Sequence, residues 1–106
     1  MRAAAPDLRL RMHFHDTRNT GLANAFASVE AGVDVLDASC GGLGGCPFAP
    51  AATGNIATED LVYMLERAGF ATGLDLERLI DTARWVCALL GKPPSAAVTR
   101  AGGFPG

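Results

Sequence analysis

The feature that most constrains the fold is a strict alternation at the start of the chain, in the stretch LRLRMHFH at residues 8–15. Apolar and basic side chains follow one another there without exception, which is the period of a half-buried strand. The apolar positions are Leu8, Leu10, Met12 and Phe14, and the basic positions are Arg9, Arg11, His13 and His15. The sequence therefore predicts a strand whose basic face ends in two histidines.

The patterns that follow predict a parallel α/β arrangement. We expect a helix over residues 20–32, a strand over 33–39, a helix over 58–69 capped by Thr58, and a helix over 75–91. The apolar stripe of the last helix consists of Leu76, Leu79, Ile80, Ala83, Cys87 and Leu90. A strand, a helix and a second strand form the unit of parallel α/β folds, but two strands are too few for a stable parallel sheet. We therefore expect residues 1–106 to form part of one larger domain, with residues 1–7 and 92–106 loosely ordered.

The composition excludes some partners. The formal net charge is -2 and 19% of the residues are charged, so we expect no nucleic acid and no anionic membrane surface as partner. No apolar run approaches the roughly 20 residues of a membrane-spanning helix. Three cysteines are an odd number and too few for a disulfide scaffold, which favours a cytoplasmic location.

The pair His13 and His15 is the first candidate for chemistry. Residues two apart in a strand project from the same face, about 6.6 Å apart, so both imidazoles can converge on one metal ion. They also end their strand, where parallel α/β folds place reacting groups, and Asp16 follows as a hydrogen-bond partner that could fix a ligand. The alternative is a pair of polar residues on a half-exposed strand face.

The stretch GGLGGCPFAP, residues 41–50, is the second candidate. Four glycines, Gly41, Gly42, Gly44 and Gly45, leave almost no side chains beside the thiol of Cys46, so the backbone can approach a ligand closely. The loop also begins at the end of the second expected strand, on the same rim as the histidines, which favours a cover over a site. The alternative is a flexible connection with an inert thiol.

Three motifs carry a resemblance to a known family. HFHDT, GGLGGCPFAP and TGNIATEDLVYML, in this order and spacing, resemble the C-terminal part of 3-hydroxy-3-methylglutaryl-CoA lyases from about Leu10 to Gly91. Isopropylmalate and homocitrate synthases share the two histidines and the later asparagine, but they lack the loop with the cysteine. The resemblance implies that the chain is the C-terminal fragment of a TIM (β/α)8 barrel and supplies its last two strands with their helices.

The resemblance also implies the site residues. His13, His15 and Asn55 would ligate a divalent metal, Mg²⁺ or Mn²⁺, which two imidazoles, an amide oxygen, a carboxylate and water suit better than a structural zinc site does. His13 would also take part in proton transfer. Cys46 would act as the thiol that transfers a proton to the reacting carbons when the glycine loop closes over an acyl-CoA substrate.

The implied reaction is a retro-Claisen cleavage of 3-hydroxy-3-methylglutaryl-CoA, or a close analogue, to acetyl-CoA and acetoacetate, as in leucine degradation. The family's metal-binding aspartate and its neighbouring arginine lie on the first barrel strand, which this chain lacks, and a TIM barrel needs roughly 200 residues or more. We therefore expect the chain alone to be inactive and poorly folded. Its expected partners are the missing N-terminal part of the barrel, a second chain or further copies of itself. The alternative is a non-catalytic remnant that binds metal weakly.

Overall fold

The computed structural model describes residues 8–44, 54–93 and 95–103, and Cys46 and Gly45 of the expected site lie outside these ranges. The elements are β1 (Arg11–His13), α1 (Gly21–Glu30), β2 (Val35–Asp37), a single 3-10 turn η1 (Cys40–Gly42), α2 (Thr58–Arg67), α3 (Leu76–Leu90) and α4 (Ala97–Ala101). The expected order of strands and long helices is confirmed. The short helix α4 was not predicted, because five residues behind a proline pair carry no periodic signal.

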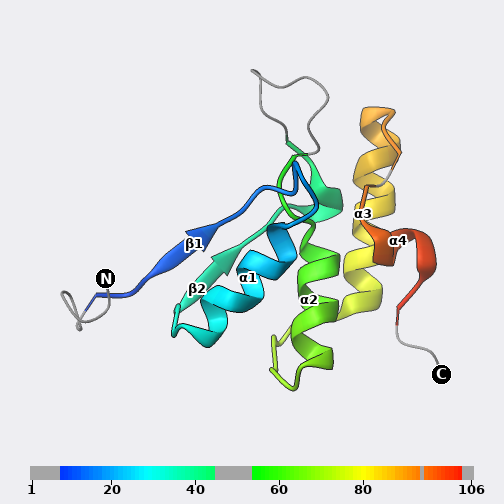
Figure 1. Ribbon diagram of the computed structural model, residues 1–106. Helices are drawn as coiled ribbons and strands as arrows, with labels where there is room; N and C mark the ends of the chain where they lie inside the picture. Colours follow the sequence, from blue (N-terminus) through cyan, green and yellow to red (C-terminus); the bar gives the residue numbers. More distant parts are fainter. Residues whose placement is uncertain (1–7, 45–53, 94, 104–106) are drawn as a thin grey trace.

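The two strands pair in parallel, with Arg11 opposite Val35, Met12 opposite Leu36 and His13 opposite Asp37. Helix α1 makes the crossover between them, and Figure 1 shows it packed beside the strands while α2, α3 and α4 lie on the far side of it. Within the described ranges, β1 is the only strand that pairs with β2, so the other edge of β2 is open to a further strand.

Both strands are shorter than the sequence patterns predict, and at their carboxyl ends the cause is the chain segment 54–58. Phe14 and Ser39 follow the two strands, and they bond to this segment rather than to each other: Ile56 N donates to Phe14 O at 3.3 Å, and Ser39 N donates to Ile56 O at 3.0 Å. Asp16 N likewise donates to Gly54 O at 3.1 Å. The segment 54–58 therefore enters between the carboxyl ends of the strands and takes the hydrogen bonds that would prolong the ladder.

Two small apolar clusters hold the helices. The first joins α1, the segment 54–58 and α2 through Ala25, Ile56 and Leu61, with Phe14, Leu22 and Leu36 packed against it. The second joins α2, α3 and α4 through Val62, Leu76 and Ile80, with Tyr63, Leu79 and Val98 packed against it. The helical half of the chain therefore has an apolar cluster to which the strands contribute nothing.

The ends of the helices confirm some expectations and correct others. Asp75 caps α3 by accepting from Arg78 N at 3.2 Å, and Gly91 ends α3 in the left-handed conformation. Thr58 does not cap α2: the helix already begins at Thr58, and Ala57 occupies the capping position. Leu90 of the expected stripe is 55% exposed because it lies in the last turn, beyond the reach of α2 and α4. No helix in the described ranges is long and apolar enough to cross a membrane.

Candidate functional site

The two histidines lie where β1 ends. The ring centroids of His13 and His15 are 5.0 Å apart, and the rings meet edge to face at 75°. Both side chains are exposed, as the basic face of the alternating pattern requires. The expected convergence of the two imidazoles at one rim of the sheet is therefore compatible with a common ligand.

Asp37, at the end of β2, is a site residue that the sequence analysis missed. Its carboxylate bonds to His13 Nδ1 and also accepts from Arg11 Nε at 2.9 Å. The hydrogen bond from His13, with that from Arg11, holds the pKa of Asp37 below its ordinary value. The contact engages Nδ1 of His13 and so leaves Nε2 as the nitrogen that can bind a metal. The register of the two strands sets Asp37 opposite His13, and the sequence patterns do not determine that register.

Asn55 lies beside the histidines because its backbone pairs with that of His15. The segment 54–58 runs antiparallel to the chain at His15, where Asn55 and His15 form an isolated bridge. The amide Nδ2 of Asn55 donates to Leu43 O at 2.9 Å, which turns Oδ1 to the opposite side of the amide. Asn55 is distant from the histidines in the sequence. The pairing of the segment 54–58 with the chain at His15 brings it to the same rim of the sheet.

The rim therefore gathers two imidazoles and one amide from two separate stretches of the sequence, residues 13–15 and the segment 54–58.

The glycine loop leaves the fold through a narrow neck at this rim. Gly54 packs directly on the backbone of Gly44: a Cβ at Gly54 would overlap the carbonyl carbon and oxygen of Gly44. A Cβ at Gly44 would in turn lie 2.8 Å from Asn55 Nδ2. The chain enters and leaves the loop side by side, and only glycine fits on both sides of this neck. Gly41 and Gly42 are buried at the start of the loop, and Gly44 is exposed.

We expect Gly54→Ala to destabilise the chain by about 3 kcal/mol or more, because the new methyl group would meet backbone that cannot rotate away. The measurement is urea unfolding followed by circular dichroism. Gly69→Ala is the matched control: Gly69 has φ +96 but open space around it, so that variant carries only backbone strain of about 1–2 kcal/mol. Equal losses in the two variants would contradict the tight neck.

The remaining polar and thiol groups near the rim have other contacts. Asp16 Oδ1 accepts from Gly21 N at 3.2 Å at the start of α1, and its role in fixing a metal ligand stays a prediction. Burial, and next to it the charge of Glu59, raises the pKa of the Cys40 thiol, which disfavours the reactive thiolate. Cys87 is 1% exposed and is the small core residue that its place on the helix stripe indicates.

The donor set at the rim fits part of a site for a hard divalent cation. In the described ranges, no three side chains of His, Cys, Asp or Glu gather as a metal cluster. The expected third ligand is an amide, and His13, His15 and Asn55 offer two imidazole nitrogens and one amide oxygen at the same rim. Such a set can bind Mg²⁺ or Mn²⁺ once a carboxylate and water complete it.

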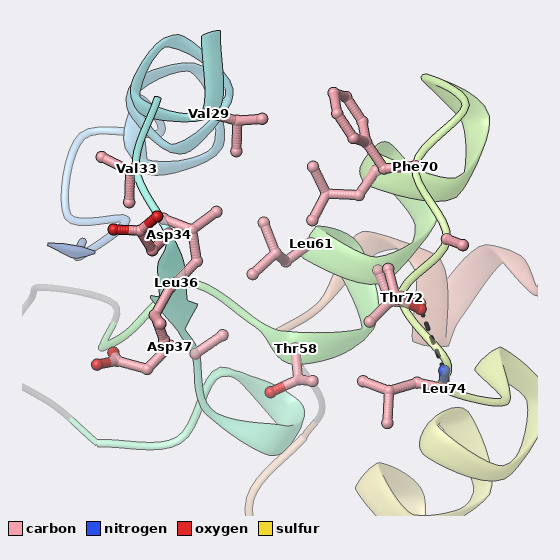
Figure 2. A pocket seen from close by; sticks show the side chains of 15 residues that line it. Val29, Val33, Asp34, Leu36, Asp37, Thr58, Leu61, Phe70, Thr72 and Leu74 are labelled. Carbon is pink, nitrogen blue, oxygen red and sulfur yellow. Dashed lines mark hydrogen bonds between the residues drawn. The ribbon is translucent and has the colours of Figure 1, made fainter. Parts of the chain in front are cut away.

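A pocket in the described part of the chain lies beside β2, on the side of α2. Its volume is about 620 Å³. Figure 2 shows Leu36 of β2 and Leu61 of α2 on opposite walls, with Phe70 and Leu74 from the connection between α2 and α3 closing one side. The lining of this pocket is mostly apolar.

Comparisons with known proteins agree with the geometry of the rim. Residues 1–86 match the model of the family described as HMGL-like. The chain is 53% identical over 97 residues to the (R)-citramalyl-CoA lyase of Chloroflexus aurantiacus, covering 92% of this chain and 31% of that protein. It is 50% identical over 91 residues to a hydroxymethylglutaryl-CoA lyase of Bacillus subtilis, covering 86% of this chain and 30% of that protein.

A solved structure extends the similarity to the fold. The crystal structure of the Bacillus subtilis HMG-CoA lyase superposes with a TM-score of 0.88 at 45% identity, covering 93% of this chain and 33% of that chain. The described elements therefore form an α/β arrangement that matches a TIM-barrel lyase over this length. The chain spans about a third of the length of the proteins that it matches.

Proposed function

Because the chain belongs to the HMGL-like family, and its relatives are acyl-CoA lyases, we propose that it supplies the last two strands of a metal-dependent carbon–carbon lyase barrel. The reaction is the retro-Claisen cleavage of 3-hydroxy-3-methylglutaryl-CoA or a close 3-hydroxy-acyl analogue to acetyl-CoA and a second carbonyl product. The observation that carries the proposal is the meeting of His13, His15 and Asn55 at the strand ends.

His13, His15 and Asn55 would hold the cation, Mg²⁺ or Mn²⁺. When bound, the cation supplies Lewis-acid stabilisation of the negative charge that develops on the substrate hydroxyl oxygen. Asp37 fixes the ring of His13 by bonding to Nδ1, which leaves Nε2 for the cation. The resemblance to the lyase family adds proton transfer as a second role for His13.

Cys46 would move the second proton. The loop begins at Gly41 and Gly42, on the rim that carries the histidines, so a substrate at this rim lies within the region that the loop can cover. The thiol protonates the carbon that becomes the methyl group of acetyl-CoA, or assists that step. Gly41, Gly42, Gly44 and Gly45 let the loop backbone approach the acyl-CoA without side chains in the way.

The rest of the barrel is the proposed partner. A parallel strand can continue the sheet along the open edge of β2, and the helix that follows it can fill the apolar pocket between β2 and α2. The relatives are about three times as long as this chain, so they contain enough residues to supply these elements. If nothing covers the open edge of β2 and the apolar pocket, the alternative applies: the chain is a non-catalytic remnant that binds metal weakly.

The thiol is tested in a chimera, in which this chain replaces the matching segment of the Bacillus subtilis hydroxymethylglutaryl-CoA lyase. Cys46→Ser is expected to lower kcat by at least about a hundredfold, because a serine hydroxyl is a far weaker acid than a thiol. Mn²⁺ affinity, measured by calorimetry, should stay within about twofold, since the thiol acts on the substrate and not on the cation.

Cys87→Ser is the control for that experiment. The side chain is buried in α3, so we expect a loss of about 1 kcal/mol in the free energy of unfolding and an unchanged kcat. Full turnover in Cys46→Ser would show that the loop covers the site without transferring a proton.

A further inference from the structure

A fully buried carboxylate joins the start of the glycine loop to α4. Glu59, in the first turn of α2, is 0% exposed. Its Oε1 accepts from Gly41 N at 2.8 Å, and its Oε2 accepts from Thr99 Oγ1 at 2.6 Å. Burial of a carboxylate is costly unless both oxygens are hydrogen-bonded, and here both are.

The same segment reaches Gly41 a second time. Ser95 Oγ donates to Gly41 O at 2.9 Å, so both polar atoms of this glycine are bound by side chains. Asp60, the neighbour of Glu59, accepts from Ala97 N at 3.2 Å and from Val98 N at 2.9 Å. Two consecutive acids of α2 therefore hold α4 and the start of the glycine loop together. We call this arrangement of Gly41, Glu59, Ser95 and Thr99 the clasp.

The clasp leaves the start of the loop little room to move. Gly41 has φ +70, and a Cβ there would lie 2.9 Å from Cys87 Sγ. A Cβ at Gly42 would overlap Ser95 Oγ. The two glycines are thus enclosed by α3 and by the segment before α4, in backbone conformations that only glycine adopts without strain.

The position of Gly41 affects the side chain of Asn55 through Leu43. Leu43 lies two residues after Gly41, and its carbonyl oxygen accepts from Asn55 Nδ2 at 2.9 Å. This hydrogen bond determines which way the amide oxygen of Asn55 points. A shift of the chain at Gly41 would therefore move the Leu43 carbonyl and release the amide.

We propose that Glu59 and Thr99 are positioning residues, which fix the start of the glycine loop and thereby the amide of Asn55. The step to Asn55 as a metal ligand rests on the proposed function, whereas the clasp itself does not. Helix α4 then helps to position the site through Thr99, although α4 lies on the far side of α2 and α3 from the strands (Figure 1).

The test compares three threonine variants. Thr99→Val keeps the shape of the side chain but leaves Glu59 Oε2 without its donor, Thr99→Ser keeps the hydroxyl, and Thr82→Val removes an exposed hydroxyl that bonds to Arg78 O. The first measurement is amide hydrogen exchange at Gly41 in the 106-residue chain, with the alkylation rate of Cys40 as a second probe. The second measurement is the Mn²⁺ affinity of the chimera.

We expect Thr99→Val to speed exchange at Gly41 by at least about tenfold and to accelerate alkylation of Cys40, while Thr99→Ser and Thr82→Val remain close to the wild type. Mn²⁺ binding to the chimera should weaken several-fold in Thr99→Val alone. Unchanged exchange at Gly41 in Thr99→Val overturns the clasp. Faster exchange with unchanged Mn²⁺ affinity overturns the step to Asn55. A wild-type chimera that binds no Mn²⁺ overturns the proposed metal site, while the exchange data still decide the clasp.

Discussion

His13→Ala or His15→Ala in the chimera is expected to weaken Mn²⁺ binding by at least about a hundredfold, below detection by calorimetry. Removal of a residue that only supports a ligand already costs about 10–100-fold in metal affinity, so loss of a ligand should cost more. Asn55→Ala should weaken binding to a smaller extent, because a neutral amide oxygen gives less than an imidazole nitrogen and water can replace it.

Two further variants sharpen this result. Asp37→Asn keeps the size of the side chain but removes the charge that fixes His13, so an intermediate loss of about tenfold is expected. Arg9→Ala removes an exposed basic side chain in the segment before β1 and should leave Mn²⁺ affinity unchanged. Unchanged affinity in both histidine variants would remove the metal assignment.

The second large effect is the loss of all lyase activity in the isolated 106-residue chain. Within the described ranges, β2 pairs only with β1, and the strand residues of β1 are exposed. The proposed ligands His13 and His15 thus lie on a strand pair, and in the part of the chain that the structure describes no three His, Cys, Asp or Glu side chains form a metal cluster there. Loss of a single preorganised electrostatic group costs about a hundredfold or more in rate, so the combined loss should leave nothing measurable.

Hydrogen exchange of the isolated chain should show where the order is lost. In residues 8–44, 54–93 and 95–103 no third strand joins β1 and β2, so this pair is expected to exchange rapidly. Helices α2, α3 and α4 keep the cluster around Val62, Leu76 and Ile80. Metal-dependent cleavage of 3-hydroxy-3-methylglutaryl-CoA by the purified chain, with protected amides in β1 and β2, would contradict this prediction.

The sequence predicts the elements well where a periodic pattern is strong. The alternation in residues 8–15 and the stripe of α3 identify a strand and a helix, because both depend on local periodicity. The sequence patterns extend both strands too far at their carboxyl ends, because the distant segment 54–58 takes the hydrogen bonds of Phe14 and Ser39. Local patterns contain no information about such a competitor.

Some residues of the candidate site can be recognised from the sequence, and others cannot. The histidines are recognisable from their spacing and Asn55 from the family motifs, but Asp37 and Glu59 needed the tertiary structure. Asp37 becomes a site residue through the parallel register, and Glu59 looks like an ordinary acid in the first turn of a helix. Its complete burial between Gly41 and Thr99 depends on α4, a helix too short for any pattern to predict.

The most direct test of the account is the cleavage of 3-hydroxy-3-methylglutaryl-CoA by the chimera in the presence of Mn²⁺, with the release of acetyl-CoA measured. We predict metal-dependent cleavage by the chimera carrying the wild-type chain, and a loss of at least about a hundredfold when His13 is replaced by alanine. A chimera that unfolds cooperatively on heating but releases no acetyl-CoA, with or without the metal, would contradict the proposal that this chain supplies metal ligands and a catalytic thiol to a lyase barrel.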